Sequence, residues 1–84
     1  MQLMQLKYSP RADALYVQLG DQPVAYSKDI SRDGDYTRGV DYAEDGTPVG
    51  VELLNVSKGV DLTNVPRAGE VASLLSAHGI RQLA

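Results

Sequence analysis

The spacing of apolar residues constrains the fold of this chain most, because it changes once along the sequence. Apolar and polar residues alternate through the first two thirds, as in the segments 4–8 and 15–19. Alternation with a period of two predicts strands that bury one face. We therefore expect about five strands within residues 2–56, at 4–8, 15–19, 24–30, 36–42 and 49–53.

The third of these expected strands is unusually polar for a strand. It carries Ser27, Lys28 and Asp29 in succession. Charged side chains protect the edge of a sheet from further pairing, so we expect this strand at an edge, or expect it to end early.

The clearest turn joins the last two expected strands at Glu44-Asp45-Gly46. This tripeptide suits a type I turn in which Gly46 supplies a positive φ. Beyond the turn, the apolar residues change parity at Leu53-Leu54. A one-residue slip exchanges the two faces of a strand, so we expect a bulge or the end of the strand there.

The last third of the chain has a helical period. Apolar residues between Ala68 and His78 mark one broad helical face. We expect a loop at 57–65 and a helix at about 66–78. The expected elements are therefore about five strands followed by one helix.

Residues at both ends of the expected helix suit its caps. Asn64 is a good N-cap, and Pro66 fits the first turn. Gly79 is placed as the C′ residue, with Ile80 packing back on the helix as in a Schellman ending.

Together these elements predict a single α+β domain over residues 1–84. We expect an antiparallel β-meander of about five strands with one C-terminal helix packed on one face. One helix covers only part of such a sheet. The opposite face then either stays wet or is covered by a second chain.

The five tyrosines are the only aromatic residues, and all lie on expected strands. Tyr8 and Tyr42 are expected in the core, in place of the missing Phe and Trp. Tyr16 is expected on the face of its strand that lies away from the apolar residues. A role in the core and a role in an interface are equally open to it. The interface candidates are Tyr16, Tyr26 and Gln18. We predict a homodimer through the sheet face or an edge strand, with Tyr16 near its centre.

Charge and composition exclude several function classes. The net charge is −3, and the basic residues are scattered among acids, so we expect no nucleic acid or membrane partner. No apolar run approaches the roughly 20 residues of a membrane span. The alternating first residues do not resemble a secretion signal, and cysteine is absent. We expect a cytoplasmic protein without a disulfide framework or a thiolate metal site.

The strongest motif-like pattern is acidic. Asp41, Asp45, Gly46 and Glu52 fall at the first, fifth, sixth and twelfth positions of an EF-hand calcium loop. The third position is Ala43, which has no side-chain oxygen, and the flanking segments are expected strands. The pattern therefore favours a turn with an acidic tip. Asp41, Asp45 and Glu52 are only weak metal candidates, and no cofactor is expected.

No catalytic residue is predicted. The lone His78 falls at the expected C-terminus of the helix, where a partly positive imidazole is favoured by the helix dipole. No nucleophile elbow and no glycine-rich phosphate loop occurs in the sequence. Among structural residues, Asp13 is expected to accept hydrogen bonds from nearby turn amides, and Gly46 and Gly79 to end their elements.

Two segments, Tyr8 to Val17 and Asp41 to Ser57, resemble a family of small bacterial proteins catalogued as domain of unknown function 2283. Its pattern has aspartate where this chain has Ser9, and often alanine where this chain has Val56. The resemblance covers roughly residues 4–60 and carries over no catalytic residues. Some members are encoded beside small toxin-like proteins, which implies an antitoxin-like binding role by analogy only.

These observations favour a non-enzymatic protein-interaction module that self-associates and can bind a small partner protein. The alternative is a small metal-binding or hydrolytic domain that uses the acidic hairpin.

Overall fold

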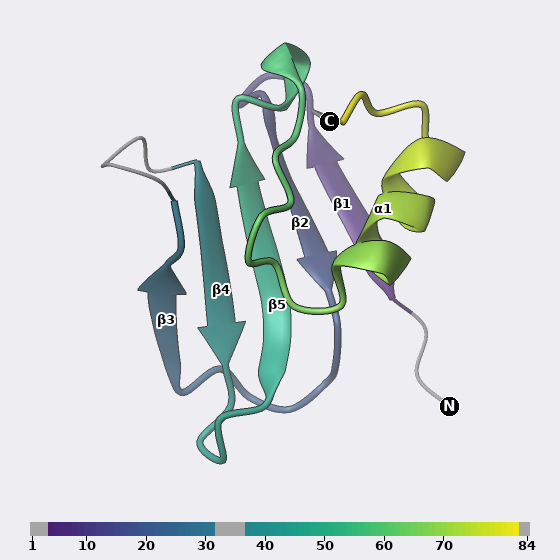
Figure 1. The fold of residues 1–84 in the computed structure, drawn as a ribbon. Coiled ribbons are helices and arrows are strands. Elements are labelled where there is room, and N and C mark those ends of the chain that lie inside the picture. Colours follow the sequence, from purple (N-terminus) through teal and green to yellow (C-terminus); the bar gives the residue numbers. More distant parts are fainter. Residues whose placement is uncertain (1–3, 32–36, 83–84) are drawn as a thin grey trace.

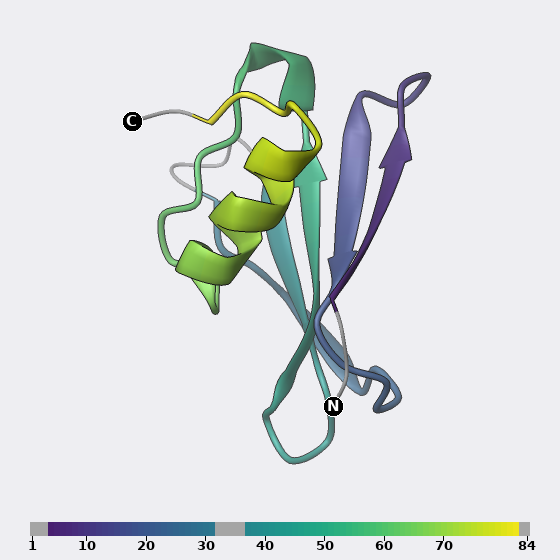
Figure 2. The ribbon, with the colours of Figure 1, turned by 90° about the vertical axis from the view of Figure 1, so that its right-hand side faces the viewer.

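Five antiparallel strands form one sheet, and a single helix crosses one of its faces (Figures 1 and 2). The computed structural model describes residues 4–31 and 37–82. The elements are β1 (Gln5–Ser9), β2 (Ala14–Gln18), β3 (Tyr26–Asp29), β4 (Arg38–Tyr42), β5 (Pro48–Leu54), the 3₁₀ helix η1 (Val56–Lys58) and α1 (Ala68–Ala77).

The α+β class and the antiparallel sheet with one C-terminal helix are confirmed, but the strand order differs from a meander. The order across the sheet is β1-β2-β5-β4-β3, so β5 lies between β2 and β4. β2 and β5 are the strands with the most apolar inner faces, and Val17 pairs with Val51 at the centre. Because they lie near the centre of the sheet, both strands are buried on the side that faces the helix. β3, whose residues are all exposed, takes the edge as expected.

The core is aliphatic and lies between the sheet and α1. Val17, Val51 and Leu53 of the sheet and Val71 and Leu75 of α1 are at most 1% exposed. The segment before α1 crosses the same face, and no described element lies over the other face (Figure 2). As far as the described residues go, one side of the sheet is therefore open across all five strands.

The start of α1 differs from the prediction. Arg67 has a φ of 55° and precedes the first helical residue, so Pro66 and Asn64 lie outside the helix. Buried Val65 anchors the preceding segment in the core, and Arg67 in the left-handed region turns the chain into the helix. Arg67 is held there by Glu70, whose carboxylate accepts two hydrogen bonds from its guanidinium.

The end of α1 has the geometry of a Schellman motif. Gly79 has a φ of 71°, and its amide donates to the Ser76 carbonyl. The Ile80 amide donates to the Leu75 carbonyl, and Ile80 packs against the core. Both hydrogen bonds match the motif.

The hairpin between β4 and β5 also follows its sequence signal. Gly46 has a φ of 87°, and its amide donates to the Ala43 carbonyl at 3.0 Å. β5 ends at Leu54, near the parity change. A register shift occurs instead between Asp41 and Tyr42.

The expected role of Tyr8 in the core is wrong, because this side chain is 49% exposed. Tyr8 lies on the edge strand β1, whose outer side has no described neighbour. Tyr42 is half-buried and stacks on Tyr26, with ring centroids 5.2 Å apart. Tyr36, expected at the start of its strand, lies outside the described residues.

Among the described residues, no helix is both long enough and apolar enough to cross a lipid bilayer, and α1 has only 10 residues.

Candidate functional site: the open face of the sheet

Side chains on the open face are arranged in rows across the strands, because directly paired residues point to the same side. Two rows cross all five strands: Lys7, Tyr16, Glu52, Gly39 and Asp29, and Gln5, Gln18, Gly50, Asp41 and Ser27. Both rows contain one glycine. The two glycines have different surroundings, and that difference defines the site.

Tyr16 lies across Gly50 from β2 to β4. A Cβ atom on Gly50 would overlap Oη and Cζ of the tyrosine ring. Tyr16 Oη donates a hydrogen bond of 2.7 Å to Asp41 Oδ2, and Ser27 Oγ donates to the other carboxylate oxygen. Gly50 is thus required by the ring that covers it, and Asp41 is held from two sides.

The surroundings of Tyr16 disfavour its ionised form. Burial raises the pKa of its phenol to about 12, and the hydrogen bond to Asp41 and the negative charges of Asp41 and Glu52 act in the same direction. The neutral hydroxyl is the form that donates to Asp41. Tyr16 is therefore a positioning group at neutral pH and has no tendency to act as a base.

The alkaline titration of Tyr16 is a direct check of this arrangement. The folded pKa of about 12 lies above the ordinary value of 10.0, so the unfolded chain loses this proton first. Stability should be intact below pH 10 and fall as the pH rises from 10 to 12. Tyrosinate absorbance and melting temperature, both against pH, measure the two effects.

Tyr16→Phe is the control for that titration. It should remove the late step in tyrosinate absorbance and weaken the alkaline loss of stability. A late step that persists in Tyr16→Phe would show that another tyrosine is responsible.

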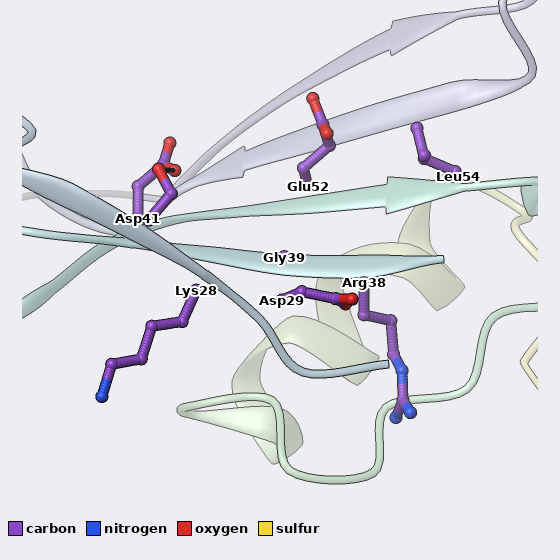
Figure 3. Close-up of a pocket in the computed structure, with 8 residues that line it drawn as sticks. Lys28, Asp29, Arg38, Gly39, Asp41, Glu52 and Leu54 are labelled. Atoms are coloured by element: carbon purple, nitrogen blue, oxygen red, sulfur yellow. Dashed lines mark hydrogen bonds between the residues drawn. The ribbon is translucent and has the colours of Figure 1, made fainter. Parts of the chain in front are cut away.

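The second glycine, Gly39, forms the floor of an open slot. The slot has a volume of about 490 Å³. Asp41, Glu52 and Leu54 point to one side of β4, whereas Lys28 and Arg38 point to the other (Figure 3). The residues around it are Ser27, Lys28, Asp29, Arg38, Gly39, Asp41, Glu52 and Leu54.

Within residues 4–31 and 37–82, no contact requires glycine at position 39. A Cβ atom there would meet only the Lys28 carbonyl oxygen at 3.7 Å, an ordinary contact, and the φ of Gly39 is not in the left-handed region. Glycine in a strand interior costs roughly 0.5–1 kcal/mol relative to alanine. Glycine in such a place often marks the close approach of a ligand or another backbone.

Carboxylates flank this floor in the same row. Glu52 on β5 and Asp29 on β3 pair with Gly39 from either side. Hydrogen bonds from the Ser31 side chain and amide hold the pKa of Asp29 below its ordinary value, so it is ionised at neutral pH. The slot therefore has the carboxylates of Glu52 and Asp29 on either side of its floor, while the cationic side chains in its lining, Lys28 and Arg38, point to the other side of β4 (Figure 3).

The structure brings together some of the residues singled out from the sequence and separates others. Tyr16, Gln18, Asp41 and Glu52 lie on the open face. Gln18 turns back to donate to the Gly20 carbonyl at 3.1 Å. Tyr26 pairs with Tyr42 and shares the helix side with Lys28, so it is not part of the same surface as Tyr16.

Asp45 lies apart from the other two metal candidates. It occupies the hairpin tip, where its carboxylate accepts a hydrogen bond of 3.0 Å from the Thr47 amide. Within residues 4–31 and 37–82, no three acidic or histidine side chains are grouped as a metal site. The spacing of Asp41, Asp45 and Glu52 along the chain therefore does not translate into a common centre.

Three residues of the site, Gly39, Asp29 and Leu54, were not identified as site residues from the sequence. The signal for Gly39 was a glycine inside an alternating run, between Arg38 and Val40. A glycine in the middle of a strand, at a position that faces outward, leaves that face without a side chain. This pattern could have been recognised in the sequence.

Comparison with known proteins gives a family but no activity. Residues 5–57, more than half of the chain, match the family described as "Protein of unknown function (DUF2283)". No curated protein and no solved structure matches the chain significantly. The matched region ends at Ser57 and contains β1 to β5, so it includes the whole open face.

Proposed function

Because the chain belongs to the DUF2283 family of proteins of unknown function, we propose its role from its open face: a non-enzymatic protein-interaction module. The slot over Gly39 binds a basic side chain of a partner protein. The observation that carries this proposal is the empty glycine floor between carboxylates, which no contact among the described residues explains.

The dimensions of the slot suit one basic group. Neighbouring strands are about 4.8 Å apart, so the strands that carry Glu52 and Asp29 are roughly 10 Å apart across β4. A guanidinium or ammonium group can lie on the Gly39 backbone with a carboxylate on each side. Arginine fits best, because its planar donors can pair with two carboxylates.

An apolar side chain extends the slot along β5. Leu54 is 37% exposed and points to the same side as Glu52 (Figure 3). Basic side chains bury their aliphatic stems on apolar surface while the charged group stays at the polar end. Leu54 next to Glu52 offers such a pair of contacts.

The charge of the open face favours a basic partner over a second copy of this face. Glu52 lies on the central strand, and Asp41 lies on the strand beside it. Two copies packed face to face would bring these carboxylates near one another, and like charges at an interface are costly. The open face is thus complementary to a basic surface.

Gly39→Val tests the slot without changing any charge. The valine side chain should fill the floor and abolish binding of a peptide of alternating arginine and alanine, measured by calorimetry at low salt. The melting temperature should stay the same or rise, because Val has a higher strand propensity than Gly. Unchanged peptide affinity in Gly39→Val would rule out the slot as the binding site.

Two charge variants distinguish binding in the slot from non-specific attraction to an acidic chain. Glu52→Gln should weaken the peptide about tenfold, as expected for one charged hydrogen bond. Glu44→Gln removes the same charge from the exposed hairpin tip and is the matched control. Equal weakening by both variants would indicate non-specific attraction.

A further inference from the structure

The two edges of the sheet differ in how well they are protected from pairing. β3 is short, and its last residues, Lys28 and Asp29, are charged. β1 is longer and carries Leu6 and Tyr8 on its helix side, with only Lys7 charged. An exposed edge with apolar side chains and few charges is a template for another strand.

An apolar hollow adjoins β1 on the helix side. Its volume is about 370 Å³, and its lining combines β1 with η1 and the segment after α1. Leu6 and Ile80 in this lining are partly buried against the core, and Val56 is buried. The full lining is Leu6, Tyr8, Val56, Ser57, His78, Gly79, Ile80 and Arg81.

We propose that β1 pairs with β1 of a second copy of this chain, antiparallel and around a two-fold axis, to form a continuous ten-stranded sheet. The axis is perpendicular to the sheet, so both helices lie on the same side. The apolar side chains of each β1 then contact those of the other copy and cover the hollow. This assembly is independent of the slot over Gly39, which lies toward the opposite edge of the sheet.

The sequence of β1 selects one register for this pairing. If Leu6 faces Leu6 of the second copy, Met4 faces its Tyr8 and Gln5 faces its Lys7. All apolar side chains then share the helix side, and no like charges meet. A register centred on Lys7 would place two lysines together.

A register centred on Tyr8 is also disfavoured. It would place Leu6 opposite Pro10 of the second copy, and proline cannot donate to the ladder. The strand is thus self-complementary in the register centred on Leu6, which favours a second copy as the occupant over an unrelated strand. A five-residue edge buries little area, so we expect dissociation in the micromolar range or above.

Sedimentation over a concentration series up to millimolar tests the dimer. The wild-type chain should pass from monomer to dimer. Tyr8→Asp should remain monomeric, because it places a charge in the apolar row at an exposed position. A wild-type chain that stays monomeric throughout, or a Tyr8→Asp variant that dimerises equally well, would overturn the proposal.

Gln5 variants test the register with charge alone. Gln5→Glu creates two pairs with Lys7 by symmetry, so the dissociation constant should fall about 2- to 30-fold at low salt. Gln5→Lys should raise it by a similar factor, and salt should weaken both effects. Gln5 is exposed, so these variants keep the fold even if Tyr8→Asp does not. If Gln5→Glu and Gln5→Lys both dimerise with the wild-type dissociation constant, the register is contradicted.

Cross-linking gives an independent check, because the chain has no cysteine. A mixture of Gln5→Cys and Lys7→Cys chains should form disulfide dimers faster than either variant alone, since those positions face each other across the pair. Faster cross-linking of Lys7→Cys with itself would indicate the register centred on Lys7.

The variant designed for each proposal is also measured in the assay for the other, so that the slot and the β1 dimer can fail independently. Gly39→Val should leave dimerisation unchanged, and Tyr8→Asp should leave binding of the arginine–alanine peptide unchanged when affinity is compared per protomer. Loss of dimerisation in Gly39→Val would mean that the open face, rather than β1, forms the dimer interface.

Discussion

Gly50→Val should lower the melting temperature by about 10–20 °C, because a side chain at position 50 takes the place of the Tyr16 ring. Overpacking costs roughly 1–3 kcal/mol, and the lost hydrogen bond to Asp41 adds about 0.5–1.5 kcal/mol. In a domain of this size, 1 kcal/mol corresponds to a shift of about 4–8 °C. Thermal unfolding followed by circular dichroism measures the effect.

The same substitution at Gly39 is the matched control. Both glycines lie on the open face of neighbouring strands, β5 and β4, but only Gly50 is covered by a ring. Gly39→Val should therefore leave the melting temperature unchanged or raise it. Equal destabilisation by the two variants would show that strand backbone, rather than the Tyr16 ring, responds to the substitution.

A spectroscopic readout identifies the cause of the Gly50→Val effect. Displacing the ring exposes Tyr16 to water and breaks its contact with Asp41, so its pKa should fall from about 12 toward 10.0. A Gly50→Val protein whose tyrosinate titration keeps its late step would retain the ring in place, contrary to our expectation.

The parts of the fold that were predictable depend on contacts between near neighbours in sequence. The turn at Gly46 and the helix end at Gly79 are each closed by hydrogen bonds spanning a few residues. The polarity of β3 was enough to place it at an edge. Local sequence chemistry determines such features, so a single sequence is sufficient to identify them.

The strand order was not predictable in the same way. Pairing of β2 with β5 brings Val17 opposite Val51, and no turn signal connects strands so far apart. A meander and the observed order present the same alternating pattern along the chain. The two orders differ in which strands are central. The more apolar strands are expected at the centre, and only this comparison separates the meander from the observed order.

Arg38 shows the same limit for a single residue. It is 3% exposed, and it shares the helix side of β4 with Val40. Nη1 donates to the Thr63 carbonyl and lies 3.6 Å from Asp61 Oδ1. These partners come from the loop before α1, so the burial of this charge depends on tertiary structure and not on its local pattern.

Only some members of the candidate site were predictable from the sequence, and its geometry was not. Tyr16, Asp41 and Glu52 were all identified from the sequence, for two unrelated reasons, and the sheet places them together. The hydrogen bond between Tyr16 and Asp41 spans 25 residues and crosses Gly50. A contact across three strands depends on the strand order, which is why the sequence could not reveal it.

Asp13 makes a second long-range contact of this kind. The sequence predicted acceptance from nearby turn amides, but the carboxylate accepts from Ser57, 44 residues further along the chain. The Ser57 amide donates at 2.8 Å and the Ser57 hydroxyl at 2.7 Å. The Val56 amide donates to the Asp13 carbonyl in addition. Asp13 thus fastens the turn between β1 and β2 to the residues that follow β5.

Asp13→Ala should lower the melting temperature by about 10–20 °C. The change removes two hydrogen bonds to a charged acceptor, and it places alanine at a φ of 53°, where a residue without a local hydrogen bond is strained. We expect a loss of about 2–3 kcal/mol in the free energy of unfolding. Chemical denaturation and thermal melting of the two proteins measure it.

Three further variants apportion the effect of Asp13→Ala between backbone and side chain. Asp13→Gly accepts the positive φ without strain, so its deficit reports the lost hydrogen bonds together with the greater entropy of glycine in the unfolded chain, roughly 0.5–1 kcal/mol. Asp13→Asn keeps the φ preference and one acceptor, and should lose least. Ser57→Ala removes only the hydroxyl donor. If Asp13→Gly is as stable as the wild type, the carboxylate contacts with Ser57 contribute nothing, and the strained backbone accounts for the whole effect.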